Sequence, residues 1–411
     1  MSLNWSDLKA VEKKVWLAVL VAALGYFVDI YDLLLFSIVR VTSLKDLGFT
    51  EADLLSKGVL LINIQMAGLL IGGVLWGILG DRKGRLSVLF GSIIMYSSAN
   101  LLNGFVQNIE QYAILRFIAG VGLAGELGAG ITLISELLPK NVRGFGTTFV
   151  ASIGILGAVF GAFMGDMFAW RVAYMIGGGM GFLILLLRVG VTESGMFHKV
   201  KEATVERGNF LMLFATKARL IKFVSCIVIG IPIWYVVGIF LTFAPEFGKA
   251  FGMTELPTGG DAVMYGYIGL SLGDLSSGLM SQWLQSRRRA IFLFLAITVV
   301  GVAAHLLIHH TSTTSFYSTC VVMGFGVGYW CMFVQVAAEQ FGTNIRSTVT
   351  TSVPNFVRGA VIPLTASFQW ALPHFGAVGT SVIIGIVTLV ITLAGLFALS
   401  ESFHKDLDYE E

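Results

Sequence analysis

Seven charged residues lie within long apolar stretches of the sequence, where charged side chains are rare. They are Asp29, Asp32, Arg40, Arg116, Glu126, Asp274 and Arg358. If these stretches cross a lipid bilayer, each buried charge costs on the order of 3 kcal/mol on insertion scales. Such a charge persists where it is paired with another group or serves a function. These side chains are therefore the first candidates for the chemistry of the protein.

Asp29 and Asp32 are three residues apart, so in a helix they share one face with Tyr26. Two carboxylates at this spacing repel each other, and burial opposes the ionisation of both. We therefore expect at least one of them to hold a proton at neutral pH, as a proton carrier must. Which of the two does so stays open, because Asp32 has an alternative partner in Arg40 or in a bound substrate.

Arg358 lies in the stretch TSVPNFVRGAVIPL, beside Asn355 and between Pro354 and Pro363. The two prolines remove backbone donors and disturb a regular helix, which a membrane tolerates best beside a cavity or packed protein. The guanidinium of Arg358 stays charged, and its planar fork matches a carboxylate. This arrangement predicts a bound organic anion or zwitterion, a carboxylate with an apolar or aromatic body.

Two other interpretations of the buried charges stay open. Arg358 could form a purely structural ion pair with Asp274, and the acids Asp29, Asp32 and Glu126 could instead hold an organic cation. Glu126 lies in a glycine-rich run, where small residues let helices approach closely. It is therefore either a substrate contact or a hydrogen-bonded strut.

Aromatic and polar side chains of the second half could enclose a substrate, although aromatic residues in membrane helices also serve as packing groups and interface anchors. Gln369 and Trp370 are two such candidates. The predicted substrate site comprises Tyr26, Glu126, Trp234, Tyr235, Asp274, Tyr329, Trp330, Asn355 and Arg358.

The elements that must position these residues are helices that cross a membrane. Of the 411 residues, 56% are hydrophobic and only 13% are charged, and the mean hydropathy is +0.82. This composition is too apolar for ordinary soluble domains. A crossing needs roughly 20 apolar residues in a helix, and the alternating pattern of a β-barrel is not present. Twelve suitable stretches begin near Val15, Gly58, Leu86, Gln111, Phe145, Trp170, Leu220, Ala262, Ala290, Phe316, Thr351 and Gly376.

Lys and Arg residues are distributed unevenly over the segments between these stretches. With the first segment inside and the sides alternating, the inner segments hold most of the 27 cations, and the outer loops hold only Lys45, Lys57, Arg171 and Lys249. The positive-inside rule then places both termini in the cytoplasm. The first apolar stretch is longer than that of a cleaved signal, so we expect it to remain as the first helix. We expect a multi-pass protein of the plasma membrane.

The sequence repeats a charge pattern in its two halves. Glu136 precedes Arg143 by the same spacing as Glu339 precedes Arg346, and basic loops occur at corresponding places. Parallel repeats of this kind are typical of secondary transporters whose substrate site lies at mid-membrane between the halves. We therefore predict a six-helix bundle over residues 1–190, a cytoplasmic loop over 191–219, and a second six-helix bundle with a cytoplasmic tail over 220–411.

Two motifs of the first half are similar to those of a known family. The run GDRKGR from Gly80 to Arg85 resembles the signature loop of the major facilitator superfamily. The run from Arg116 to Gly144 resembles helix 4 of its sugar-porter, metabolite:proton symporter and organic-ion branches. In the second half, Gln282 stands where an acid would be expected. The resemblance implies an all-helical fold of twelve transmembrane helices in two pseudo-symmetric bundles, and secondary active transport by alternating access.

The resemblance also implies a route for proton coupling. Sugar porters pair an Asp of the first helix with the Arg that opens the helix 4 motif, which here is Arg116. Asp29, with Asp32 as the alternative, and Arg116 are thus expected to couple proton movement to substrate movement in symport. A proton on the Asp would weaken the pair and create a two-state element. A static pair that only joins two helices is the structural alternative.

Charged residues near the inner ends of the stretches are predicted to form cytoplasmic gates that close when the two halves meet. Topology signals alone would explain a cluster of arginines but not the repeated spacing of Glu and Arg. The predicted gate residues are Asp81, Arg85, Glu136, Arg143, Arg288, Glu339 and Arg346.

Motifs of other functional classes are not present in the sequence. It contains no Walker A run and no HExxH motif, so we expect neither an enzyme nor an ATP-driven pump. The histidines His305, His309 and His310 have no matching acid, and the three cysteines have no CxxC spacing, so no metal or cofactor is expected.

We expect a monomer whose partners are a small molecule, protons and lipid, without nucleic acid. A sugar or cation facilitator and a non-transporting sensor remain the alternatives.

Overall fold

The computed structural model describes residues 12–138, 140–189, 209–342 and 345–403, and these ranges contain helices and no β-strand. The helices of the first half are α2 (Lys13–Asp46), α3 (Leu54–Lys83), α4 (Arg85–Asn103), α5 (Ile109–Leu123), α6 (Glu126–Leu137), α7 (Lys140–Met167) and α8 (Trp170–Arg188). Those of the second half are η1 (Phe210–Phe214), α10 (Lys217–Val228), α11 (Ile231–Tyr235), η2 (Val236–Leu241), α12 (Ala244–Ala250), α13 (Gly259–Leu284), α14 (Arg287–Leu307), α15 (Thr313–Gly326), α16 (Trp330–Gln340), α17 (Arg346–Gly359) and α18 (Val361–Ala398).

These helices make the twelve crossings that the sequence predicts. Among the described residues, ten helical segments are long and apolar enough to cross a membrane. One of them, Thr348–Ala398, has 51 residues and is interrupted at Gly376, where φ is 66°, so it makes two crossings. The 26 residues of α13 supply the remaining crossing. Each predicted start lies within a helix, and crossing 11 begins at Arg346, earlier than predicted.

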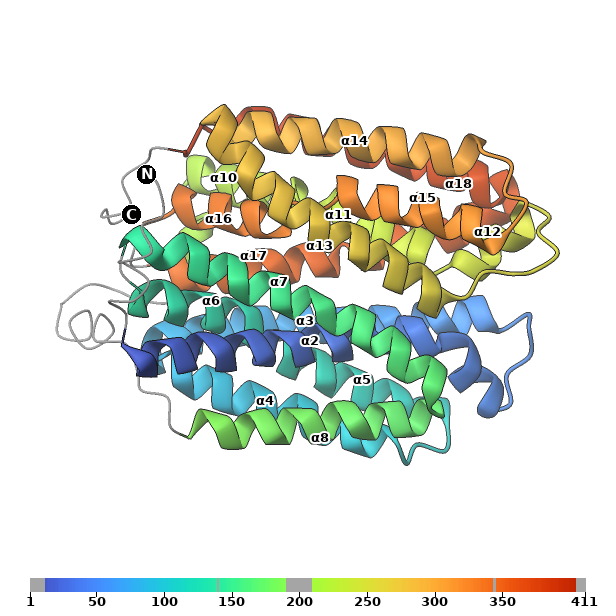
Figure 1. The fold of residues 1–411 in the computed structure, drawn as a ribbon, viewed down its shortest axis with the longest axis horizontal. Helices are drawn as coiled ribbons and strands as arrows, with labels where there is room; N and C mark the ends of the chain where they lie inside the picture. Colours follow the sequence, from blue (N-terminus) through green and yellow to red (C-terminus); the bar gives the residue numbers. More distant parts are fainter. Residues whose placement is uncertain (1–11, 139, 190–208, 343–344, 404–411) are drawn as a thin grey trace.

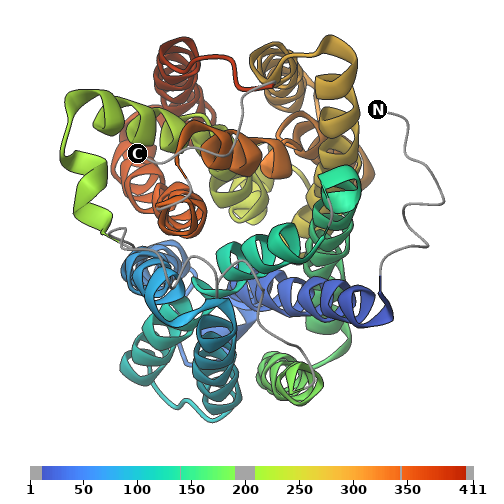
Figure 2. The same ribbon diagram turned by 90° about the vertical axis from the view of Figure 1, so that its left-hand side faces the viewer.

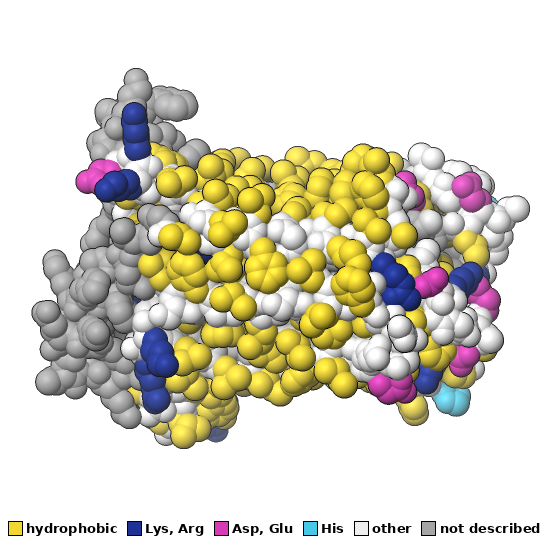
Figure 3. All heavy atoms as spheres, turned by 90° about the horizontal axis from the view of Figure 1, so that it is seen from below, with side chains coloured by type: hydrophobic (Ala, Val, Ile, Leu, Met, Phe, Trp, Pro, Cys, Tyr) yellow, Lys and Arg dark blue, Asp and Glu magenta, His cyan; other side chains and the backbone are white. Residues whose placement is uncertain are grey.

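The surface explains why the sequence is so apolar. Figure 3 shows a broad band of hydrophobic side chains, with charged side chains gathered at the two ends of the molecule. Large apolar side chains of this surface include Leu186, Leu279 and Trp283. A soluble monomer seldom exposes apolar patches of more than a few hundred Å². The band is therefore the surface that faces lipid.

The helices form two groups, one from each half of the chain (Figure 1, Figure 2). The first group contains α2 to α8, and the second contains α10 to α18. The start of α2 and the end of α18 lie at the same end of the molecule, which we call the termini side, and the opposite end is the far side (Figure 1). Most of the predicted loop over residues 191–219 lies outside the described residues.

Two crossings are interrupted at equivalent places in the two halves. Crossing 4 breaks between α5 and α6 at Gly125, and crossing 10 breaks between α15 and α16 at Gly328. The offset in numbering that relates Glu136 to Glu339 also relates these two glycines. A break frees backbone N–H and C=O groups, which a membrane protein must satisfy from neighbouring side chains. These breaks are thus places where side chains of other helices bind the backbone.

The two groups of helices pack closely against each other along α3, α6 and α17. A Cβ atom added to Gly128 of α6 would lie 2.6 Å from Cα of Thr351, and one added to Gly73 of α3 would lie 2.8 Å from Cβ of Asn355. Small residues allow this approach of two helices. In the glycine-rich run that contains Glu126, Gly128 is therefore the glycine that packs against the second half of the chain.

We predict that Gly128→Val separates the two groups on the termini side. Because the new Cβ would overlap the Thr351 backbone, the closed arrangement should lose about tenfold in population. The measurement is the rate at which a thiol reagent labels a cysteine placed at Gly77, whose Cβ would sit 3.4 Å from Thr348 in the same interface. The control is Gly130→Val, because a Cβ at Gly130 meets nothing within 4 Å. Equal labelling rates in the two variants would contradict the prediction.

Candidate functional site

A small cavity lies between the two groups of helices, halfway along α2. Its lining comes from six crossings and comprises Tyr26, Ile30, Ile155, Ile233, Trp234, Tyr267, Leu270, Trp330 and Arg358. A water-sized molecule could occupy only about 10 Å³ among these side chains. Because ligand pockets usually measure about 300 to 1,000 Å³, the cavity is nearly filled by its own side chains, which must move apart before a ligand can enter. Its position between the halves is the one that the internal repeat predicts.

Four buried donor groups at this cavity have no hydrogen-bond partner among the residues that the structure describes. They are Oη of Tyr26, Nε1 of Trp234, Nε1 of Trp330 and Nε of Arg358. Buried polar groups are nearly always paired, so four unpaired donors around one small space are unusual. A molecule with acceptor oxygens and an apolar body would satisfy these donors and fill the space between the aromatic rings.

Arg358 is held at the cavity by an ion pair that joins the two halves. Its Nη2 lies 3.1 Å from Oδ2 of Asp29, and the two side chains are 1% and 0% exposed. Its Nη1 donates a long hydrogen bond of 3.4 Å to Oδ1 of Asn355. The guanidinium carbon lies 5.5 Å from the ring centre of Trp330, within cation–π range. The site thus combines a cation, an acid and an aromatic ring.

Five predicted substrate contacts do not line the cavity: Glu126, Tyr235, Asp274, Tyr329 and Asn355. The hydroxyls of Tyr235 and Tyr329 donate to backbone carbonyls at 2.7 and 3.0 Å. The Asp274 carboxylate accepts the N–H of Cys331 at 2.8 Å. The alternative pairing of Asp274 with Arg358 is therefore wrong, because Asp274 faces the break in crossing 10. Asn355 reaches the site only through Arg358, since its Nδ2 donates to the carbonyl of Ala124 at 2.8 Å.

Five lining residues were not predicted from the sequence. Tyr267 precedes Asp274 by two helical turns, and this spacing is the signal that could have found it. The other four are apolar, and their types do not distinguish a cavity from a lipid-facing surface. They are Ile30, Ile155, Ile233 and Leu270.

Asp32 and Arg116 belong to a second polar cluster, which lies within the first half. Arg116 donates to Oδ1 of Asn100, and its guanidinium carbon lies 4.5 Å from the ring centre of Tyr174. Arg116 is the cation that acts on Asp32, and the side chain of Asn100, which accepts from Arg116, also acts on the Asp32 carboxylate. The expected pair of Asp29 and Arg116 is therefore corrected: Asp29 pairs with Arg358, and Arg116 lies beside Asn100 and Tyr174. Residues three apart differ in direction by about 60° around a helix, so Asp29 faces the second half while Asp32 faces its own.

Glu126 forms a buried ion pair with Arg188. Both Nη atoms of Arg188 donate to the Glu126 carboxylate, and Nη1 also donates to the carbonyl of Leu89 at 3.1 Å. The two side chains are 1% and 2% exposed. Of the two interpretations given for Glu126, the geometry matches the hydrogen-bonded strut, because Glu126 does not line the cavity. The sequence signal for its partner was present, since Arg188 ends an apolar stretch.

On the termini side, Asp81 binds the first turn of α17 across the boundary between the halves. Its Oδ2 accepts the backbone N–H of Thr348 at 3.0 Å and the hydroxyl of Thr348 at 2.5 Å. A carboxylate at a helix N-terminus satisfies free N–H groups and complements the helix dipole. Arg85 lies 4.0 Å from Asp81. This contact connects the signature loop of the first half directly to the helix that carries Arg358.

Other predicted gate residues lie within the second half or outside the described side chains. Glu339 pairs with Arg287 at 3.0 Å rather than with Arg288, whose guanidinium lies over Phe397. The predicted gate set thus contains Arg288 but not Arg287, which forms the ion pair; consecutive residues point about 100° apart around a helix, so only one of the two faces Glu339. Arg346 donates to backbone carbonyls at the end of α16. The side chains of Glu136 and Arg143 lie outside the part of the structure that is described.

On the far side, Arg40 forms a contact between the halves that was not predicted. Its Nη2 donates to both carboxylate oxygens of Glu246, at 2.8 and 2.9 Å, and also to the carbonyl of Thr242. Its guanidinium carbon lies 4.9 Å from the ring centre of Phe243. The proposed alternative of Asp32 with Arg40 is therefore wrong. Glu246 gave no signal in the sequence because it lies just beyond an apolar stretch.

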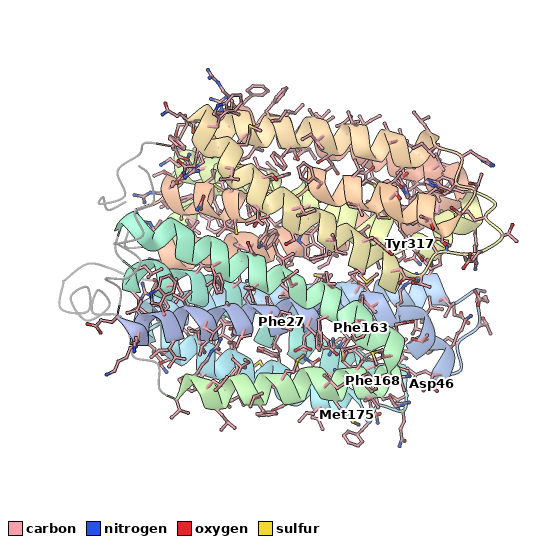
Figure 4. The ribbon with its side chains drawn as sticks, viewed as in Figure 1. Phe27, Asp46, Phe163, Phe168, Met175 and Tyr317 are labelled. Atoms are coloured by element: carbon pink, nitrogen blue, oxygen red, sulfur yellow. The ribbon has the colours of Figure 1, made fainter. Side chains whose placement is uncertain are left out.

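A second far-side contact is exposed to solvent. Glu51 of the first half binds Lys249 of the second half at 3.1 Å and also Lys45 of its own half. A hydrogen bond from Lys45, and to a lesser extent one from Lys249, holds the pKa of Glu51 below its usual range. Asp46, at the far end of α2 (Figure 4), instead binds within its own half, where its Oδ2 accepts a hydrogen bond from Nη2 of Arg171 of α8 at 3.1 Å. The halves are thus joined on both sides of the cavity.

We predict that Asp81→Ala opens the boundary on the termini side. The variant loses the bond to the first turn of α17, which is worth about 1 to 2 kcal/mol, so the closed population should fall about tenfold. The measurement is thiol labelling of the cysteine at Gly77 from the termini side. Glu246→Gln weakens the far side and should change this labelling in the opposite direction or leave it unchanged. Faster labelling in both variants would indicate general loosening and contradict the prediction.

Comparison with known proteins places this geometry in a family. The sequence model of the Major Facilitator Superfamily matches residues 15–365. A protein of Cupriavidus pinatubonensis named "Probable 4-methylmuconolactone transporter" is 27% identical over 79% of this chain and 76% of its own length. The "Gentisate transporter" of Corynebacterium glutamicum is 25% identical over 80% of this chain and 75% of its own.

A comparison of folds agrees with the family match. The crystal structure of a D-xylose–proton symporter superposes with a TM-score of 0.71 at 18% identity, over 96% of this chain and all of that one. The expected class, a transporter rather than an enzyme, is confirmed by the family match and the relatives. The chain belongs to the Major Facilitator Superfamily.

Proposed function

We propose that this chain is a symporter that carries one small organic anion together with a proton. The anion would be a carboxylate on an aromatic or other apolar body. The observation that carries this proposal is the cavity, where four unpaired donors and a buried Arg358 surround a space between aromatic rings. The names of the relatives, which give a lactone and an aromatic acid anion as cargo, support the same substrate class.

The distribution of Lys and Arg supports an orientation in which the termini side is cytoplasmic. In that orientation the contact of Asp81 with α17 closes the cytoplasmic entrance, and the ion pair of Arg40 with Glu246 closes the outer entrance. Alternating access then requires the two contacts to open in turn. We place the protein in the plasma membrane as a monomer.

Charge balance at the cavity supplies the coupling. With Asp29 ionised, its charge and that of Arg358 cancel, and a substrate carboxylate entering alone would leave one net negative charge in an apolar surrounding. A proton on Asp29 frees Arg358 for the substrate carboxylate and restores neutrality. An uncompensated buried charge costs several kcal/mol, so only the empty site and the doubly loaded site can close at low cost. Anion and proton therefore move together.

The rival proposal of an organic cation has less support. Each acid that it would use is already beside an arginine: Asp29 with Arg358, Glu126 with Arg188, and Asp32 near Arg116. A cation at the cavity would have to displace Arg358, and that guanidinium is buried and forms an ion pair with no other acid in the described part of the chain. The unpaired groups that line the cavity are donors, which suit acceptor oxygens.

We predict that Arg358→Gln abolishes binding of benzoate, the simplest aromatic carboxylate. Loss of one partner of a buried, charge-assisted contact costs about 2 to 5 kcal/mol, so the Kd should rise about 100-fold. The measurement is equilibrium binding to purified protein, with benzamide as the neutral analogue and Arg82→Gln, an exposed arginine of α3, as the control. Two results would contradict the substrate class. One is an unchanged benzoate affinity in Arg358→Gln, and the other is tighter binding of benzylamine than of benzoate by the wild type.

We predict that Asp29→Asn separates anion movement from proton movement. The neutral amide imitates the protonated acid, so exchange of benzoate across proteoliposomes should continue while accumulation driven by a pH gradient is lost. Uptake with and without the gradient measures this, and Asp166→Asn, an exposed acid of α7, is the control. If Asp29→Asn still concentrates benzoate and Asp32→Asn does not, the proton is carried by Asp32.

A further inference from the structure

We propose that Asp274 is a positioning residue, which fixes the start of α16 and thereby holds the ring of Trp330 in the cavity beside Arg358. The inference rests on the proposed function, because it assigns Trp330 as a contact of the organic anion. It starts from a buried acid that the transport chemistry does not use. Asp274 is 4% exposed, and among the described residues no Lys, Arg or His forms an ion pair with it.

The partner of Asp274 is the backbone at a helix break. Crossing 10 leaves its helical path after α15, passes through Gly328, and resumes as α16 at Trp330. Cys331 is the second residue of α16, so its N–H lies among those that have no acceptor within the helix. Oδ1 of Asp274 accepts this N–H at 2.8 Å from the neighbouring helix α13. The residue just before α16, Tyr329, supplies no capping side chain of its own.

Close packing of backbones keeps α13 at this break. A Cβ atom on Gly273 would lie 3.0 Å from Cα of Gly328, and one on Gly328 would lie 2.7 Å from the backbone nitrogen of Asp274. A side chain at either glycine would push α13 away from the break. The short Asp274 side chain reaches the N–H of Cys331 because the two backbones are in contact.

The consequence of this cap appears one residue earlier, at Trp330. The Trp330 ring lies 5.5 Å from the guanidinium carbon of Arg358 and 4.9 Å from the ring of Phe333, and its Nε1 is one of the four unpaired donors. Trp330 is the first residue of α16, so its direction depends on where that helix begins. An acceptor at the next residue determines this start. Asp274 therefore acts on the substrate site through Trp330, without touching the cavity.

The equivalent break in the first half is satisfied in the opposite manner. At crossing 4 the freed groups are carbonyls: Nε1 of Trp76 donates to Val121 at 2.7 Å, and Nδ2 of Asn355 donates to Ala124 at 2.8 Å. Donors therefore serve one break, and the acceptor Asp274 serves the other. This difference explains why the break in the second half needs a side chain that accepts a hydrogen bond.

The test compares Asp274→Ala, which removes the acceptor, with Asp274→Asn, whose amide oxygen keeps it. Two properties are measured in purified protein: the Kd for benzoate and the emission of Trp330, obtained by subtracting the spectrum of the same protein carrying Trp330→Phe. In Asp274→Ala we expect the Trp330 emission to shift and the Kd to rise about tenfold, as for loss of one buried hydrogen bond. In Asp274→Asn both properties should stay within about twofold of the wild type.

Controls separate positioning from general destabilisation. Ser277→Ala, one turn along α13, removes only a bond to the carbonyl of Asp274 within its own helix and should leave the Trp330 emission unchanged. If Asp274→Ala does not fold, Asp274→Leu removes the acceptor while keeping the volume. The inference would be overturned if the Trp330 emission and the Kd for benzoate are unchanged in the folded variant that lacks the acceptor. It would also be overturned if Asp274→Asn changes both properties as much as that variant does. If the wild type binds no benzoate but the emission shifts in Ala and not in Asn, the positioning role holds and the proposed substrate class fails.

Discussion

The ion pair of Asp29 and Arg358 crosses the boundary between the two halves at the depth where a lone charge is most costly. Removing one partner of a buried pair costs about 3 to 5 kcal/mol, because the other charge is left without compensation. The pair therefore resists separation of the halves unless another group takes the place of one partner. Glu126 and Arg188 are equally buried, but both belong to the first half and can move as one unit.

This constraint links the chemistry of the cavity to the motion of the helices. The contacts at the two ends lie on opposite sides of the central pair, with Asp81 and Thr348 at one end and Arg40 and Glu246 at the other. The far-side pair is partly buried, with Nη2 of Arg40 donating to both carboxylate oxygens of Glu246, and the termini-side contact uses a helix N-terminus, so both are stronger than ordinary surface pairs. The cavity between them is small because both entrances are closed.

The fold was largely predictable from the sequence, because hydropathy alone marks segments that must be helical in lipid. Arg358 and both acids of α2 were also identified, since charges at such depth are rare. Their pairing was not predictable. Whether Asp29 or Asp32 faces the second half depends on the rotation of α2, which spacing along one helix does not determine. The same limit explains why Arg287 rather than Arg288 binds Glu339.

The helix breaks mark another limit of prediction. Gly125 and Gly328 are visible in the sequence only as members of glycine-rich runs, and nothing in those runs shows that the helix stops there. The side chains that satisfy the freed groups, Asp274, Trp76 and Asn355, come from distant parts of the chain. A buried acid with no basic residue near it in sequence was the available signal for such a cap.

The contact between Asp81 and α17 has a consequence for how this protein can drift in evolution. On one side it needs a carboxylate, whereas on the other it uses the hydroxyl of Thr348 and also its backbone N–H, which every residue except proline supplies. Loss of the hydroxyl leaves one bond in place, whereas loss of the carboxylate removes both, so related chains should keep an acid at the position of Asp81 more strictly than a hydroxyl at that of Thr348. The pair of Arg40 and Glu246 requires two side chains, so its members should be lost or exchanged together. The two entrances would then show different patterns of substitution, one asymmetric and one correlated.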